Sequence, residues 1–316
     1  MIEADGLTRR YGETTVVDSI DLAVREGTVC AVLGPNGAGK TTTVRMLATL
    51  LRATSGSASV GGHDIRRNAH RVRQLIGLTG QYASVDENLS GRDNLTLIGK
   101  LWGMSGKRAR ARADQLLTAF DLVDVADRAA GRYSGGIRRR LDLATSLVAN
   151  SRVLFLDEPT TGLDPRSRSG LWETVRELVA DGVTVLLTTQ YLDEAAALAD
   201  HIVVIDQGRV VADGTPNDLR GHVGGRTLTV RPRRPRDLPL VQERMAAALP
   251  EALSSSRGGV RARIEDIDGI QPVIDRLAGL EIAELSMNDP SLEETFFRLT
   301  ERPSPFPAEP AIKDIP

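Results

Sequence analysis

A glycine-rich segment with one lysine is the first part of this sequence that could carry chemistry. Residues 34–41 follow the pattern G-x-x-x-x-G-K-[ST], directly after an apolar run and directly before a stretch with helical spacing. In such a segment, backbone N–H groups turn inward on phosphate oxygens, and the positive end of the helix strengthens the attraction. Lys40 would reach the outer phosphates of a nucleotide, and the Thr41 hydroxyl would bind Mg²⁺. The predicted phosphate-binding residues are Gly34, Pro35, Asn36, Gly37, Ala38, Gly39, Lys40, Thr41 and Thr42.

Two adjacent carboxylates supply the second part of the predicted site. Asp157 and Glu158 follow the apolar run 153–156, and ligands of open α/β sheets bind beyond the carboxyl ends of such strands. Asp157 suits the shell of a Mg²⁺ ion. Glu158, one residue farther, suits a base that polarises the attacking water in phosphoryl transfer. A solvated acidic turn is the alternative, and the phosphate-binding segment upstream argues against it.

The elements that must position these residues alternate between β and α. Short, continuous apolar runs are typical of strands buried on both faces of a sheet. They occupy residues 28–33, 153–157, 183–188 and 202–205. Stretches with helical spacing occupy residues 41–51, 108–120 and 166–180. This alternation predicts an α/β fold with a mostly parallel core.

The chain is long enough for one large and one small domain. Residues 1–221 carry both motifs, and the span of about 82–148 within them shows helical spacing and few β signals. Residues 222–301 show a compact βαβαβα pattern and are expected to form a small C-terminal α/β domain. Residues 302–316 are rich in proline and can bury little, so we expect this tail to be extended or disordered.

Composition argues against several other functions. The formal net charge is −2, so no strong overall field would draw the chain to nucleic acid or to an anionic bilayer. No stretch approaches the roughly 18 to 20 apolar residues of a membrane-spanning helix. The first residues lack the features of a secretory signal, so we expect a cytoplasmic chain. The single cysteine, Cys30, lies in an apolar run and is expected to be a buried thiol.

A loop ahead of the acidic pair indicates which class of nucleotide-binding protein the sequence resembles. The two motifs fit any P-loop NTPase, but residues 133–138, with the sequence Tyr-Ser-Gly-Gly-Ile-Arg, resemble the signature loop of ATP-binding cassette (ABC) proteins. The resemblance covers residues 1 to about 221. It implies the cassette fold, in which an antiparallel β portion and a helical insert accompany the mostly parallel core. It also implies ATP and Mg²⁺ as cofactors.

Further positions match nucleotide-binding residues of that family. By this resemblance Tyr11 stacks on adenine, for which its flat ring is suited, although plain packing is the alternative for a lone tyrosine. Gln81 would bind Mg²⁺ together with Thr41 and Asp157. Asp164 ends a segment that matches the family's D-loop and is counted among the nucleotide-binding residues.

The signature residues would form a second anion site. Ser134, Gly135 and Gly136 precede a stretch of helical spacing, so their hydroxyl and N–H groups would gather at a helix start. Because the chain already holds one phosphate-binding segment, this second site would serve a partner. In the family it closes over the ATP of the opposite subunit. A second copy of the chain or a homologous ATPase is therefore expected.

Departures from the family pattern bear on turnover. Ile137 replaces the usual glutamine of the signature and Tyr133 its usual leucine, but the Ser-Gly-Gly core is kept. Gln190 stands where the family has its switch histidine. Its amide can donate a hydrogen bond to the γ-phosphate, but it cannot carry a charge or relay a proton, which is consistent with slow hydrolysis. We assign catalysis to Lys40, Glu158 and Gln190, with Glu158 as the base and Gln190 as a neutral sensor.

One branch of the family is matched more closely. The runs 190–195 and 289–296, with the arginines 138–140, resemble the daunorubicin-resistance type of bacterial drug-export ATPase. The resemblance implies separate membrane permease subunits, a peripheral place on the cytoplasmic face of the membrane, and export of a drug-like or lipid-like substrate. The helical insert and the Gln81 loop would receive a permease helix. The three arginines are expected to form the solvated face of their helix rather than a substrate or phosphate contact.

Two other functions compete with export. A soluble cassette ATPase that acts on ribosomes or DNA usually carries two cassettes with basic linkers, or long coiled coils, and neither pattern occurs here. We therefore expect no nucleic-acid partner. A slow nucleotide-dependent sensor is kept open by Gln190 alone.

Overall fold

The chain forms two compact units, which divide between Pro216 and Asn217. The computed structural model describes residues 1–80, 85–222, 226–249, 253–255, 258–264 and 270–288, together with Phe296. From the sequence we expected the division after residue 221. Helix α8 (Pro216–His222) begins at the division and runs up to the glycine-rich segment that suggested the later boundary. The proline-rich residues 302–316 lie outside the described residues.

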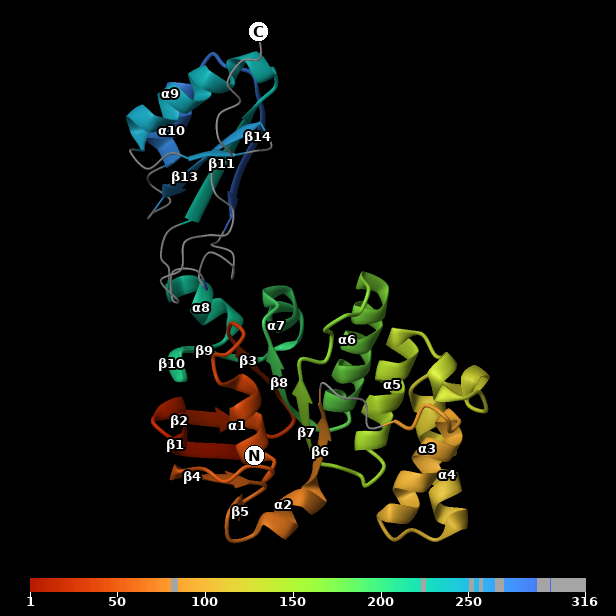
Figure 1. Ribbon diagram of the computed structural model, residues 1–316. Helices are drawn as coiled ribbons and strands as arrows, with labels where there is room; N and C mark the ends of the chain where they lie inside the picture. Colours follow the sequence, from red (N-terminus) through yellow and green to blue (C-terminus); the bar gives the residue numbers. More distant parts are fainter. Residues whose placement is uncertain are drawn as a thin grey trace. The chain divides into compact units, whose positions relative to one another are not determined.

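A six-stranded sheet with strand order β10-β9-β3-β8-β7-β6 is the centre of the first unit (Figure 1). Its strands are β3 (Val29–Leu33), β6 (Ile76–Thr79), β7 (Val153–Asp157), β8 (Thr184–Thr189), β9 (His201–Asp206) and β10 (Arg209–Gly214). The strands from β9 to β6 pair in parallel, and β10 pairs antiparallel with β9. Every residue of β3, β7 and β8 is buried, which explains their continuous apolar sequence and confirms the expected parallel core. Burial raises the pKa of the Cys30 thiol on β3 to about 12, so the thiol stays protonated at neutral pH.

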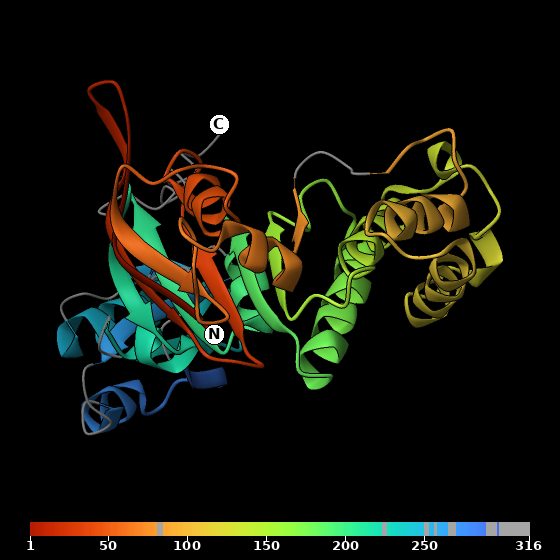
Figure 2. The same ribbon diagram turned by 90° about the horizontal axis from the view of Figure 1, so that it is seen from below.

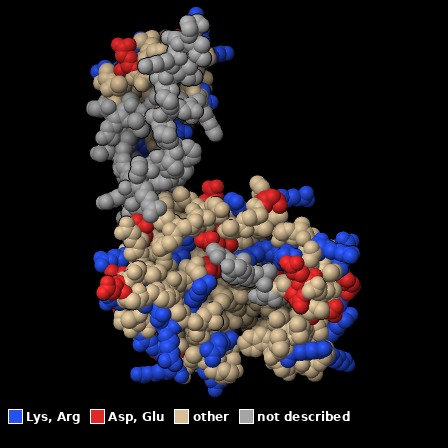
Figure 3. All heavy atoms as spheres, viewed as in Figure 1, with Lys and Arg blue, Asp and Glu red and all other residues tan. Residues whose placement is uncertain are grey.

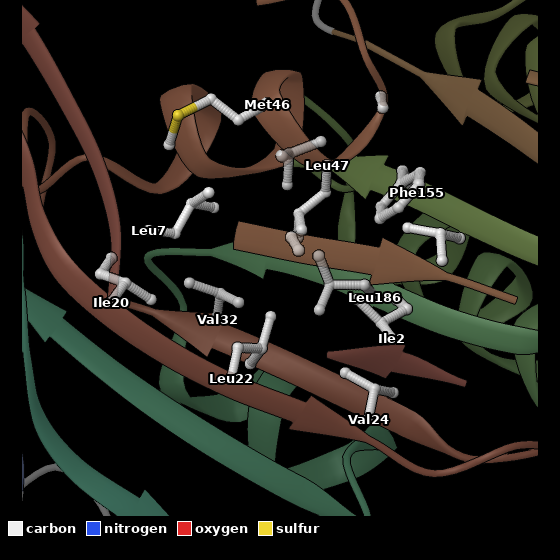
Figure 4. Close-up of a cluster of buried hydrophobic side chains, with 14 of the residues drawn as sticks. Ile2, Leu7, Ile20, Leu22, Val24, Val32, Met46, Leu47, Phe155 and Leu186 are labelled. Atoms are coloured by element: carbon white, nitrogen blue, oxygen red, sulfur yellow. The ribbon is translucent and has the colours of Figure 1, made fainter. Parts of the chain in front are cut away.

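A second, antiparallel sheet with order β2-β1-β4-β5 shares a core with the first. Its strands are β1 (Ile2–Tyr11), β2 (Thr14–Val24), β4 (Ser55–Val60) and β5 (His63–Asp64). In β2, the buried residues Ile20, Leu22 and Val24 alternate with exposed ones, so one face of the strand is apolar. Figure 4 shows these side chains gathered with Val32 of β3 and Phe155 of β7.

The helices of the first unit surround the sheets and form a separate insert. They are α1 (Lys40–Leu47), α2 (Ala69–Leu75), α3 (Gly91–Leu101), α4 (Gly106–Ala119), α5 (Gly135–Ser146), α6 (Pro165–Ala180) and α7 (Leu192–Leu198). The chain forms α3, α4 and α5 between β6 and β7, and Figures 1 and 2 both show α3 and α4 on the side away from the antiparallel sheet. The expected helical insert is therefore confirmed. No described helix is both long and apolar enough to span a membrane.

Side chains at the helix starts fix where the three helices of the insert and α6 begin. A serine or aspartate side chain accepts a hydrogen bond from the backbone N–H three residues on, which satisfies a donor that the helix itself leaves free. These N-caps are Ser90 for α3, Ser105 for α4, Ser134 for α5 and Asp164 for α6.

Helix α1 is shorter than its sequence predicts. We expected a helix over residues 41–51, but α1 ends at Leu47. Thr49 takes a positive φ of 62°, and the N–H groups of Leu50 and Leu51 both donate to the Arg45 carbonyl. This tight turn satisfies the last carbonyls of the helix and ends it.

The second unit has an antiparallel sheet of order β12-β13-β11-β14. Its elements are β11 (Arg226–Pro232), α9 (Leu238–Ala248), β12 (Leu253–Ser255), β13 (Gly259–Ile264), α10 (Ile270–Leu277) and β14 (Ile282–Asn288). Its core is formed by Leu228, Val230, Val241, Met245, Val260 and Val273. The expected βαβαβα pattern lacks β12, because Ser254 and Ser255 interrupt any apolar run. The last helix of that pattern falls outside the described residues, apart from Phe296.

Replacing Phe155 by alanine should destabilise the first unit, because Phe155 is fully buried where the two sheets meet. We expect the free energy of unfolding to fall by about 3–5 kcal/mol, as for other buried phenylalanines. Urea denaturation followed by circular dichroism measures the change. Leu101→Ala is the control, since Leu101 is 74% exposed and its loss should cost no more than about 0.5 kcal/mol. Equal effects of the two substitutions would contradict this description of the core.

Candidate functional site

The predicted phosphate-binding loop joins β3 to α1 and is pressed against neighbouring backbone. A side chain at Gly34 would place its Cβ 2.2 Å from the Ile205 carbonyl oxygen. Gly39 has a φ of 102°, and a Cβ there would lie 2.7 Å from the carbonyl oxygen of Val16. Both positions therefore require glycine, for close approach and for the left-handed backbone.

The turn between β9 and β10 holds this loop from outside. The Gly208 N–H donates to the Ala38 carbonyl at 3.0 Å, and the Asp18 N–H donates to the Gly208 carbonyl at 2.8 Å. A Cβ at Gly208 would lie 2.6 Å from the Val16 carbonyl oxygen. The loop is thus fastened to both sheets through one glycine.

Lys40 lies inside the loop, with only 4% of its side chain exposed. Its Nζ donates to the carbonyl oxygens of Gly34 at 2.8 Å and Pro35 at 3.0 Å, and it lies 3.5 Å from Oε1 of Glu158. Burial lowers the pKa of the Lys40 ammonium, and the Glu158 carboxylate opposes that shift. A phosphate entering the loop would compete with this carboxylate for Lys40.

Asp157 and Thr41 meet through a direct hydrogen bond. The Thr41 hydroxyl donates to Oδ1 of Asp157 at 2.9 Å, and the Thr188 hydroxyl donates to the same oxygen at 2.6 Å. The carboxylate is buried at the end of β7. Hydroxyl and carboxylate oxygens are hard donors of the kind that Mg²⁺ prefers, so this pair fits the predicted ion.

Glu158 turns away from the direction of β7. It has a φ of 50°, and its N–H donates to the Thr188 carbonyl at 3.1 Å. The Thr161 hydroxyl donates to its Oε2 at 3.4 Å, while Lys40 faces Oε1. A left-handed backbone at a non-glycine residue is a strained conformation that the surroundings must hold. Here it directs the carboxylate toward the phosphate-binding loop.

Gln190 follows the last residue of β8, close to the start of the loop. The Gly34 N–H donates to the Thr189 carbonyl at 3.2 Å, and the Tyr191 N–H donates to the Thr189 hydroxyl at 2.9 Å. These bonds fix the backbone on both sides of the Gln190 side chain, which is half-buried.

Tyr11 ends β1 and is 48% exposed. The Arg9 guanidinium carbon lies 4.4 Å from the centre of its ring, so a cation already stacks on one face. An adenine could take the other face or displace Arg9. Nothing in the sequence indicated this pairing.

The starts of α5 and α6 lie against each other. Ser134 and Gly135 are exposed at the start of α5, and a Cβ at Gly136 would lie 2.4 Å from the Ser167 hydroxyl oxygen. Asp164 accepts from the Ser167 N–H at 3.0 Å and from its hydroxyl at 2.7 Å. These hydrogen bonds lower the pKa of the Asp164 carboxyl, which therefore stays ionised. Gln81, the remaining predicted site residue, lies outside the described residues.

One arginine that we expected on a solvated surface is instead mostly buried beside the site. Arg139 is 14% exposed, and its guanidinium donates to the carbonyl oxygens of Gly80 and Pro159. Burial lowers the pKa of the guanidinium, and the carboxylate of Asp142 raises it. The expectation fails because three consecutive arginines on a helix point in different directions. The buried Asp142, three residues on, was the available signal for the one that points inward.

Comparison with known proteins agrees with the features described so far. A sequence model of the ABC transporter family matches residues 17–161. The daunorubicin resistance ATP-binding protein DrrA2 of Streptomyces coeruleorubidus is 51% identical, over 95% of this chain and 94% of that protein. The doxorubicin resistance ATP-binding protein DrrA of Mycobacterium tuberculosis is 42% identical, over 96% of this chain and 94% of that protein.

Solved structures show the same fold. An ATP-binding subunit of an ABC transporter superposes with a TM-score of 0.63 at 27% identity, covering 71% of this chain and 93% of the other. An ATP-binding cassette of an ABC transporter in its ADP conformation gives a TM-score of 0.62 at 26% identity, covering 69% of this chain and 92% of the other. The expected cassette fold is confirmed. On this similarity over nearly its whole length, the chain belongs to the ATP-binding proteins of the ABC transporter family and is an ATPase of that family.

Proposed function

We propose that this ATPase powers export of a drug-like or lipid-like molecule through separate membrane permease subunits, from the cytoplasmic face of the membrane. The daunorubicin and doxorubicin resistance proteins support this function, because the chain matches them over more than nine-tenths of its length. The observation that carries the ATPase part is at the end of β7, where Glu158 faces Lys40 and Asp157 accepts a hydrogen bond from Thr41.

ATP would bind with its phosphates in the loop 34–41 and its adenine on Tyr11. The N–H groups at the start of α1 would face the phosphates, where the helix dipole favours negative charge. Phosphate oxygens would take the place of the Glu158 carboxylate beside Lys40. Binding would therefore release Glu158 as it fills the loop.

The released carboxylate suits the role of base. Glu158 stands one residue beyond Asp157, with its backbone held by Thr188, so it can face a water that approaches the γ-phosphate. Gln190 would donate a hydrogen bond to the same phosphate. Mg²⁺, held by Thr41, Asp157 and Gln81, would neutralise charge that builds on the phosphate oxygens.

A second subunit would complete each site. The exposed Ser134 and Gly135 at the start of α5 offer a hydroxyl and N–H groups to an anion outside their own chain. Asp164 is close to this helix start, because it is hydrogen-bonded to Ser167, which packs against Gly136. We propose that they close over the ATP of a partner, so that two copies, or this chain and a homologue, bind two ATP molecules between them.

A slow sensor is the second candidate function, and Gln190 is the observation that favours it. A neutral amide cannot relay a proton as an imidazole does, so turnover without a partner would be slow. Phosphate release by the purified chain, with and without its permease, separates the two functions: absence of release in both would favour the sensor.

Glu158→Gln should remove turnover and keep nucleotide binding. The amide cannot act as a base, so we expect ATP hydrolysis to fall by about 10²- to 10⁴-fold. ATP should bind at least as tightly as before, because the substitution removes the carboxylate that competes for Lys40. Phosphate release and calorimetric titration measure the two quantities. Glu177→Gln is the control: Glu177 is exposed on α6, and its substitution should change neither the hydrolysis rate nor the ATP affinity. Full turnover in Glu158→Gln would contradict the assignment of the base.

ATP should bring two Glu158→Gln subunits together. Light scattering is expected to show twice the monomer mass with ATP and the monomer mass without it. Ser134→Glu, added to this variant, should keep the protein monomeric, because a carboxylate would then face the partner's phosphates. Ser105→Glu is the matched control: Ser105 is also an exposed N-cap serine, on α4. Dimers that persist in Ser134→Glu would rule out the proposed second anion site.

Export should depend on the phosphate-binding lysine. We expect a multi-span membrane protein to co-purify with the chain, and the two expressed together in a drug-sensitive host should lower cellular daunorubicin. Lys40→Ala should restore accumulation, because the loop would lose its cation for the outer phosphates. Equal drug efflux with wild type and Lys40→Ala, or co-purification with ribosomes or DNA alone, would overturn the export proposal.

A further inference from the structure

Arg139 is a mostly buried cation beside the nucleotide site, and the proposed mechanism gives it no role. Its neighbours on α5, Arg138 and Arg140, are more exposed and pair with the carboxylates of Glu87 at 2.8 Å and Asp121 at 3.3 Å. Arg139 points inward instead. Its surroundings therefore call for an explanation that the other two arginines do not need.

The guanidinium of Arg139 joins two separate backbone segments. Its Nε donates to the Pro159 carbonyl at 2.8 Å, and its Nη1 donates to the Gly80 carbonyl at 2.9 Å. Pro159 directly follows Glu158, and Gly80 directly precedes Gln81. One side chain on α5 is thus bonded to the main chain next to two proposed site residues.

Asp142 holds this guanidinium in place. Its Oδ2 accepts from Nη1 of Arg139 at 3.1 Å, and its side chain is almost completely buried. The two residues stand one turn apart on α5, so the helix itself sets the direction of the pair. The planar guanidinium of the arginine can then reach two carbonyls, one in the loop after β6 and one in the loop after β7.

Stability alone does not account for this arrangement. A buried ion pair often contributes little to stability, because both charges lose their water. In addition, Nη2 of Arg139 is buried with no hydrogen-bond partner among the residues that the structure describes, which is unfavourable. A role in the placement of the two backbone segments explains why a charged fork occupies this position.

We propose that Arg139 is a positioning residue for ATP hydrolysis, which keeps the backbone before Gln81 and after Glu158 in register with the helix that begins at Ser134. The inference rests on the proposed roles of those three residues. Movement of α5 toward a partner's ATP is then imposed on both segments of its own site. Arg139 acts through the backbone that it holds.

The test compares Arg139→Met/Asp142→Asn with Asp142→Asn alone. The double variant removes both buried charges, so no unpaired charge is left to unfold the protein, and it also removes the donors to Gly80 and Pro159. Asp142→Asn keeps those donors. Arg140→Met is the control for loss of an arginine from the same helix. Each protein is assayed as the full chain for ATP affinity, KM and kcat, with thermal melting to verify folding.

We expect the double variant to keep its ATP affinity and KM while its kcat falls by about 10- to 100-fold relative to Asp142→Asn, because small displacements of reacting groups have effects of this size. Arg140→Met should turn over nearly as wild type does. Asp142→Asn should keep most of its kcat, because the asparagine amide oxygen can still accept from Nη1 of Arg139 and the donors to Gly80 and Pro159 remain. Arg139→Lys, which keeps the charge and some donors, should recover part of the lost kcat. A double variant with the kcat of Asp142→Asn would overturn the proposal.

Hydrogen–deuterium exchange gives a second reading that does not depend on turnover. Backbone amides that flank Gly80 and Pro159 should exchange faster in the double variant than in Asp142→Asn, and amides of β3 should not change. Unchanged exchange at both segments would also overturn the positioning role. Turnover of the wild-type protein tests the proposed function separately, so a failure of the positioning role of Arg139 can be distinguished from a failure of the proposed function.

Discussion

A buried ammonium that needs oxygen partners is the constraint on which the site depends. Lys40 is buried, and its ammonium donates to two carbonyl oxygens of its own loop and faces the Glu158 carboxylate. For that carboxylate to arrive, β7 must end at Asp157 and the next residue must take a left-handed backbone. The loop after β3 and the end of β7 are therefore adjusted to the same cation. The two sheets and their shared core hold the loop after β3 and the end of β7 at the separation that the ion pair of Lys40 and Glu158 needs.

The residues around this cation could be predicted because their chemistry leaves few alternatives. A lysine after glycines at fixed spacing implies a phosphate site without knowledge of the fold, and beside that segment the paired carboxylates after a buried strand are assigned to the same site. The strands β3, β7 and β8 were predictable for a related reason, since burial on both faces requires an unbroken apolar sequence. The N-caps at Ser134 and Asp164, which we did not predict, also follow from local hydrogen bonding.

Features that depend on a particular neighbour could not be predicted in this way. The inward turn of Arg139 depends on carbonyls of Gly80 and Pro159, which are distant in sequence. The stacking of Arg9 on Tyr11 and the early end of α1 at Leu47 also arise from local geometry that propensities do not describe. The strand β12 is short and partly polar, so its pairing with β13 is visible only in the sheet. A sequence pattern indicates which contacts a residue needs, but it does not show which distant residue supplies them.

The glycine between β9 and β10 has a consequence for affinity. Gly208 bonds to the phosphate-binding loop on one side and to β2 on the other, and Gly34 and Gly39 fit against backbone with no room for a side chain. A loop braced on several sides keeps its shape whether or not a ligand is present. Little conformational entropy then remains to be lost when ATP arrives, and more of the attraction between N–H groups and phosphate appears as binding. Preorganisation of the nucleotide site is thus a property of a turn more than 150 residues away in the chain.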